Sequence, residues 1–90
     1  MRLDPTIQLA DTSGYVKISL VKRYKAREVV SILKQDGWYL VKIRGSHHHF
    51  KHPTKLGKVT VPYKTGNEDI KVGTLKSILK QARINLKEVN

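Results

Sequence analysis

The chain contains no cysteine, and only seven of its 90 residues are acidic. Without cysteine, neither a disulfide framework nor a thiolate zinc site can form. No apolar run approaches the roughly 18 residues of a membrane span, and the first residues lack the apolar core of a signal peptide. We therefore expect a cytoplasmic protein with no membrane partner.

The scarcity of acidic residues leaves a large positive charge. Eighteen Lys or Arg residues give a formal net charge of +11. Six of them lie between Gly37 and Asn67, a stretch without Asp or Glu. Clustered positive charge favours binding to phosphate backbones through counterion release. An acidic protein partner is the alternative use of the same charge.

The length predicts one small domain with additions at both ends. We expect the domain over residues 23–84 and a charged tail over 85–90, either frayed or paired with a partner. Residues 1–22 form an N-terminal extension in which 6–10 and 15–20 alternate apolar and polar residues around a turn-like segment, 11–14. This pattern predicts either a hairpin or a disordered leader.

Two amphipathic helices are predicted, over about residues 24–36 and 74–82, because apolar residues recur there at i, i+3, i+4 and i+7. Gly37 is expected to end the first helix. Three strands are expected between the helices, at residues 39–44, 47–51 and 58–62, with a polar loop at 63–72. We expect Trp38 and Tyr39 to pack in the core, and Tyr63 to be the better candidate for stacking on a base.

This order, α-β-β-β-α, predicts an α+β fold. Two apolar helix stripes and one sheet are buried together most economically when both helices cover one face of a three-stranded antiparallel sheet. The other face of the sheet would then stay open to solvent.

The four histidines of the chain all lie in one segment, Gly-Ser-His-His-His-Phe-Lys-His, residues 45–52. Histidine is the side chain that both takes and gives a proton near neutral pH. Side chains alternate along a strand, so an inward Phe50 places His47 and His49 on the open face. The same parity adds five residues to that face: Lys42, Arg44, Lys51, Lys58 and Thr60.

Three interpretations of these histidines compete. They are half-buried polar residues of a strand, or His47 and His49 share a metal ion with His52 nearby. The third interpretation is acid–base catalysis of RNA cleavage, with Lys and Arg stabilising charge on the phosphorane.

Several motifs in this order resemble the HicA toxin family of bacterial toxin–antitoxin systems. They are Ala26–Leu33 followed by Asp36-Gly37-Trp38, then Gly45–Pro53, Val59–Pro62 and Gly73–Ala82. The resemblance covers about residues 23–84, and it is the Gly-Ser-His element joined to the Gly-Thr-Leu-x-x-Ile-Leu helix that makes it specific. Chains of this family usually begin close to the first helix, so residues 1–22 depart from the pattern.

The resemblance implies a fold like a double-stranded-RNA-binding domain and a metal-independent endoribonuclease, or mRNA interferase, without a cofactor. Its implied partners are mRNA and a HicB-like antitoxin, with operator DNA reached only through the antitoxin complex. The histidine after Gly-Ser is the catalytic one in such proteins, which maps to His47. We expect RNA contacts from the other open-face residues and the turn: Lys42, Arg44, Ser46, His49, Lys51 and Lys58.

The sequence leaves the second proton carrier open between His49 and a nearby lysine. Gly45 and Ser46 also have a purely structural interpretation as turn residues. A non-catalytic RNA- or DNA-binding module and a metal-dependent nuclease remain the rival functions.

Overall fold

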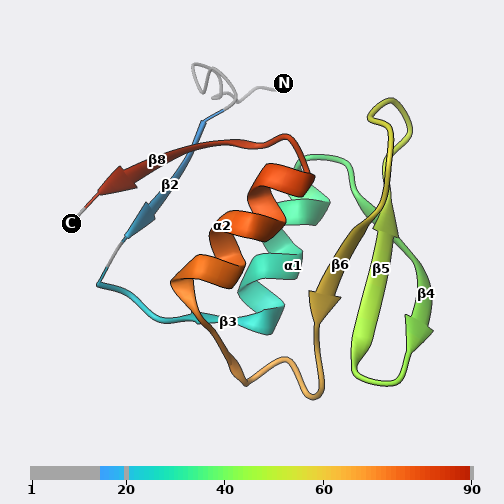
Figure 1. Cartoon of the computed structure of the whole chain (residues 1–90), viewed down its shortest axis with the longest axis horizontal. Helices are drawn as coiled ribbons and strands as arrows, with labels where there is room; N and C mark the ends of the chain where they lie inside the picture. The colour runs from blue at the N-terminus through green and yellow to red at the C-terminus, as the bar shows by residue number, and fades with distance from the viewer. Residues whose placement is uncertain (1–14, 20, 90) are drawn as a thin grey trace, which may run out of the picture.

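The computed structural model describes residues 15–19 and 21–89. It has an α+β fold in which two helices, α1 (Ala26–Gln35) and α2 (Val72–Gln81), lie on one side of a three-stranded antiparallel sheet (Figure 1). The sheet consists of β4 (Tyr39–Arg44), β5 (His47–Lys51) and β6 (Val59–Pro62) in that order. The predicted meander and both helices are confirmed, with helix ends shifted by a few residues. Neither helix of the described residues is long and apolar enough to cross a membrane.

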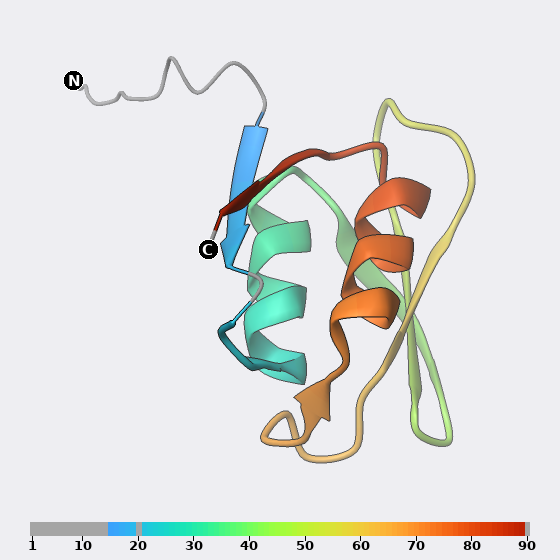
Figure 2. The ribbon, with the colours of Figure 1, turned by 60° about the vertical axis from the view of Figure 1, so that its left-hand side comes forward.

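Two further strand pairs lie outside this α-β-β-β-α frame. Strand β2 (Tyr15–Ser19) pairs in parallel with β8 (Asn85–Val89), and β3 (Tyr24–Lys25) pairs with β7 (Asp69–Ile70). In both views the helices lie between the β2–β8 pair and the sheet (Figures 1 and 2). The C-terminal tail, predicted to be frayed or paired with a partner, instead forms a strand that pairs with β2 of the same chain. The predicted polar loop contains a short strand, β7.

Only the second half of the predicted N-terminal hairpin lies within the described residues. Its second half is strand β2, whose partner in the described residues is β8 at the other end of the chain. Its first half, residues 6–10, lies outside the described residues. The pair is held to the helices by buried Ile18 and by an ion pair of 2.9 Å between Lys76 and Glu88.

The core lies between the sheet and the helices. Phe50, Val59 and Val61 of the sheet are fully buried, and so are Leu33 and Leu75 of the helices. Because these sheet residues share one face, that face is buried against the helices, and the opposite face can carry polar side chains. Trp38 is 2% exposed, as predicted. Placing Tyr39 in the core was wrong, since half of its surface is exposed.

Both helices end in the same backbone motif. Gly37, at φ 108°, donates its N–H to Lys34, and the Trp38 N–H reaches the carbonyl of Leu33. This is the Schellman arrangement, which satisfies carbonyls that a helix end leaves free. In α2 the left-handed position is occupied by Arg83, at φ 54°, which turns the chain toward β8.

The loop of residues 63–68 is built around Glu68. Its carboxylate accepts the backbone N–H groups of Lys64, Thr65 and Gly66. These hydrogen bonds, that from Lys64 foremost, lower the pKa of Glu68 to about 2. The Glu68 carbonyl in turn accepts the N–H of Ala26 at 2.9 Å, so the loop also satisfies the start of α1.

We predict that Glu68→Gln lowers the melting temperature by several degrees at neutral pH, because the neutral amide is a weaker acceptor for three N–H groups. The folded-state pKa is depressed, so the stability from Glu68 is fully present above the ordinary pKa of 4.5 and is lost as the pH falls toward about 2. Melting temperatures measured over this range should fall less steeply for the variant. Equal acid dependence in the two proteins would contradict this role.

Candidate catalytic surface

The histidine strand β5 is the centre of the sheet and presents its polar side chains away from the helices. In the β4–β5 register Arg44 pairs with His47 and Lys42 pairs with His49, while His49 also pairs with Thr60 of β6. Paired residues on antiparallel strands share a face. We call this the open face, and its members are Lys42, Arg44, His47, His49, Lys51, Lys58 and Thr60. The placement follows the parity predicted from Phe50.

A β-bulge in β4 changes one part of the predicted alternation. The register shifts between Leu40 and Lys42, so Val41 has no partner of its own on β5. Tyr39 consequently pairs with Lys51 and lies on the open side, whereas Leu40 pairs with Phe50. Strand β4 has no neighbour on its other side among the described residues, and every residue in it is exposed.

A shallow hollow of about 300 Å³ lies on the open face. Five polar side chains and one apolar one line it: Val41, Lys42, Arg44, His49, Lys51 and Lys58. Strands β4 to β6 contain no acidic residue, so the hollow combines four cations and one imidazole without a carboxylate. Such a surface suits a phosphate group.

His49 is the histidine at this hollow. It is half-buried, and its Nδ1 lies 2.9 Å from the Thr60 hydroxyl oxygen. Partial burial lowers the pKa of His49 from its ordinary 6.5, and the positive charges of Lys58, His47, Lys42 and Arg44 lower it further. His49 is therefore neutral at pH 7, the form that accepts a proton.

His47 lies at the start of β5, directly after the hairpin turn, and is exposed. Gly45 has φ 58°, the left-handed conformation that a two-residue hairpin needs at its first position. The carbonyl of Ser46 accepts the N–H of Tyr63 at 2.7 Å. The structural interpretation of Gly45 and Ser46 is thus confirmed. An RNA contact by the Ser46 hydroxyl stays a prediction.

His48 points to the opposite side of the strand from His47. It pairs with Val61, which is buried, and its ring stacks on Tyr63 with centroids 4.2 Å apart. Tyr63 was the predicted stacking residue for a base, but one face of its ring is covered by this contact.

His52 has a structural position that the sequence pattern did not distinguish. Its Nε2 lies 2.7 Å from the Asp36 carbonyl oxygen, and its Nδ1 accepts the N–H groups of Thr54 and Lys55, each at 3.1 Å. The ring also meets Trp38 edge-on at 5.2 Å. These contacts tie the β5–β6 loop to the end of α1.

The suggested metal set of His47, His49 and His52 is not brought together, because His52 faces the core side of the sheet. No group of three His or acidic side chains able to hold a metal ion occurs within residues 15–19 and 21–89.

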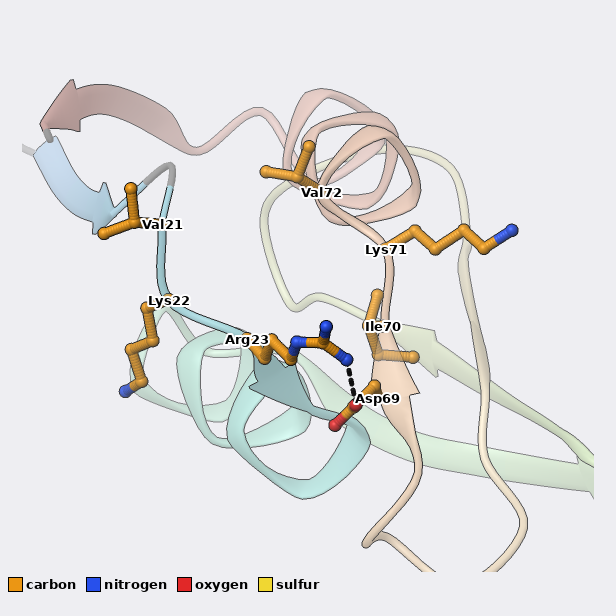
Figure 3. A pocket seen from close by; sticks show the side chains of 7 residues that line it. All are labelled: Val21, Lys22, Arg23, Asp69, Ile70, Lys71 and Val72. Atoms are coloured by element: carbon orange, nitrogen blue, oxygen red, sulfur yellow. Dashed lines mark hydrogen bonds and ion pairs between the residues drawn. The ribbon is translucent and has the colours of Figure 1, made fainter.

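A second basic hollow lies at the start of α2, lined by Val21, Lys22, Arg23, Asp69, Ile70, Lys71 and Val72 (Figure 3). Figure 3 shows Arg23 turned toward Asp69, at 3.4 Å, and Lys25 lies 3.2 Å from the same carboxylate. Lys25 and then Arg23 lower the pKa of Asp69. Part of the positive charge is therefore neutralised within the chain, and this hollow has no histidine.

The chain is a small basic α+β domain whose open sheet face is polar and cationic. A comparison with protein families matches residues 26–84 to the model described as the HicA toxin of bacterial toxin–antitoxin systems. The chain belongs to the HicA toxin family and is the toxin of such a system. Among curated proteins no match was found. Strand β2 precedes the matched residues, and strand β8 begins directly after them.

We predict that His52→Ala destabilises the fold by about 1–3 kcal/mol, since the Asp36 carbonyl and two loop N–H groups lose their partner. His47→Ala makes the same chemical change at an exposed position and should stay within about 0.5 kcal/mol of the native protein. Urea unfolding of both variants measures the difference. Comparable losses in the two would contradict the structural assignment of His52.

Proposed function

We propose that this toxin is a metal-independent endoribonuclease that cleaves mRNA, with His47 as a general acid or base. The observation that carries the proposal is the position of His47: exposed, on an acid-free sheet face, among Lys and Arg side chains. A proton carrier is useful in RNA cleavage only where a phosphate also binds, and this face supplies both.

The cleavage proposed is attack of a ribose 2′-hydroxyl on its own phosphate. One proton leaves the 2′-oxygen as it bonds to phosphorus, and another reaches the departing 5′-oxygen. Lys42, Arg44, Lys51 and Lys58 hold the phosphate and offset its growing charge. His49 and Ser46 add contacts to the RNA. Each positioned acid or base contributes about 10²–10⁴-fold, so a site with few such groups turns over slowly.

The fold we infer is that of a double-stranded-RNA-binding domain, formed by residues 23–84, with residues 1–22 and 85–90 as additions. Its support is the α1-β4-β5-β6-α2 order with both helices on one face (Figure 1). Membership of a toxin–antitoxin family indicates an antitoxin, which we propose to be HicB-like. It would meet operator DNA as part of that complex rather than through the toxin alone. We expect both proteins in the cytoplasm.

We predict that His47→Ala lowers the RNA cleavage rate by about 10²–10⁴-fold while RNA affinity changes little. The ring is removed from the reaction, but the neighbouring cations that bind phosphate remain. Cleavage of a labelled RNA measures the first quantity and fluorescence anisotropy the second. Expressed without antitoxin, the native chain should arrest growth and the variant should not.

The rival functions give different results in the same assays. A non-catalytic binding module would show no cleavage by either protein, with toxicity kept in His47→Ala and lost in Lys58→Ala. A metal-dependent nuclease would lose activity on addition of a chelator, whereas the proposed mechanism keeps it.

The antitoxin complex is predicted to weaken as salt rises, and RNA should compete with the antitoxin for the toxin. The reason is that the open face is cationic without acidic neighbours, so any partner covering it releases counterions. Affinities at low and high ionic strength test this expectation. An affinity unaffected by salt, or simultaneous binding of RNA and antitoxin, would place the antitoxin elsewhere.

A further inference from the structure

We propose that His49 is the second proton-transfer residue of the open face and that Thr60 is its positioning residue. This inference rests on the proposed ribonuclease function and goes beyond it, because it assigns both proton transfers to named atoms.

The first support is the hydrogen bond between the two side chains. Thr60 lies opposite His49 in the β5–β6 register, and its hydroxyl oxygen is 2.9 Å from Nδ1. Both side chains are half-buried, His49 on the central strand β5 and Thr60 on the neighbouring strand β6. When Nδ1–H donates to the Thr60 oxygen, Nε2 carries no hydrogen and is the ring atom able to take a proton.

The second support is the place of the ring. His49 lines the hollow whose other polar walls are Lys42, Arg44, Lys51 and Lys58. A phosphate in this hollow would lie beside the imidazole rather than at a distance from it. Among the described residues, no hydrogen bond occupies Nε2 of His49.

The third support is the relation to His47. The two residues lie at i and i+2 of one strand, on the same face, which separates their Cα atoms by about 6.6 Å. Attacking and departing oxygens lie on opposite sides of phosphorus during in-line transfer. Two imidazoles at this spacing can serve the two oxygens of one phosphate, whereas His48 between them faces the core side.

Each residue then has one step. Nε2 of His49 takes the proton of the 2′-hydroxyl, the 2′-oxygen bonds to phosphorus, and the phosphorus–5′-oxygen bond breaks. His47, in its protonated form, gives its proton to the 5′-oxygen. The products are a 2′,3′-cyclic phosphate and a 5′-hydroxyl end. One proton has moved from RNA to His49 and one from His47 to RNA, and exchange with water restores both rings.

The charges around the open face agree with His49 acting as the base and His47 as the acid. Partial burial and the charges of Lys58, His47, Lys42 and Arg44 lower the pKa of His49 below 6.5, so the ring is unprotonated at neutral pH. Lys51 and Thr60 are its remaining neighbours on the face, and Thr60 is uncharged. A base loses activity as the pH falls through its pKa, so cleavage by the native protein should persist somewhat below pH 6.5.

The experiment compares purified full-length variants on a labelled single-stranded RNA of mixed sequence. At saturating protein, His49→Ala should cleave about 10²–10⁴-fold more slowly than the native chain, and its rate should no longer fall on the acid side. His48→Ala is the matched control: a histidine of the same strand on the opposite face, expected to cleave at the native rate. Thermal unfolding confirms that each variant is folded.

Thr60 is tested by the tautomer of His49. Ring nitrogen chemical shifts from ¹⁵N NMR at neutral pH should show hydrogen on Nδ1 of His49 in the native protein. Thr60→Val should lose this preference and cleave severalfold more slowly, and Thr60→Ser should restore both. Hydrogen on Nε2 in the native protein would overturn the role of Thr60.

The outcomes separate this inference from the function on which it rests. If His47→Ala is inactive but His49→Ala cleaves at the native rate, His49 is not the second carrier and the ribonuclease proposal stands. A His49→Ala defect that disappears at saturating protein would reduce His49 to an RNA contact. Full activity in His47→Ala would overturn both proposals.

Discussion

Burial of Phe50 is the constraint on which the rest of the structure depends. Its side chain is fully buried beside Val59 and Val61, against the two helices. Because strand side chains alternate, this one apolar residue in a polar strand sends His47 and His49 to the opposite face. A shift of one residue in the β5 register would bury those imidazoles among aliphatic side chains and bring Phe50 into water. Folding and the candidate chemistry therefore depend on the same contact.

The four histidines show how position separates identical side chains. His47 is exposed beside the hairpin, His49 hydrogen bonds to Thr60, His48 stacks on Tyr63, and His52 ties a loop to α1. His47 and His49, on the open face, lie beside Lys and Arg side chains and are accessible to solvent. The two on the other side meet aromatic rings and backbone groups, and their ring atoms or faces are already occupied. The cluster thus divides into two histidines on the open face, to which we assign the proposed proton transfers, and two whose rings make structural contacts.

Much of this arrangement follows from the sequence because it depends on local patterns. The helix stripes, Gly37 and the inward Phe50 predict both helices, the meander and the open face.

The pairing of β2 with β8 joins residues about 70 positions apart, and no local pattern carries that information. The bulge at Val41 was missed because regular alternation hides one extra residue, and with it the exposure of Tyr39. The role of His52 depends on backbone groups of Asp36, Thr54 and Lys55, whose positions only folding defines. An acidic residue opposite His49 would have been visible as a partner. Thr60 was predicted on the open face but not as the partner of His49, because the register that sets the two opposite each other on β5 and β6 is defined only by folding.

The central claim is that this toxin cleaves RNA by proton transfer to and from the RNA's own hydroxyl groups. The most direct measurement is mass spectrometry of the ends produced when the purified chain cleaves a defined RNA in the presence of a chelator. Our account predicts 2′,3′-cyclic phosphate and 5′-hydroxyl ends, and no cut where the 2′-hydroxyl next to the scissile phosphate is replaced by hydrogen. Ends bearing 3′-hydroxyl and 5′-phosphate groups, or cleavage at that deoxy position, would contradict it.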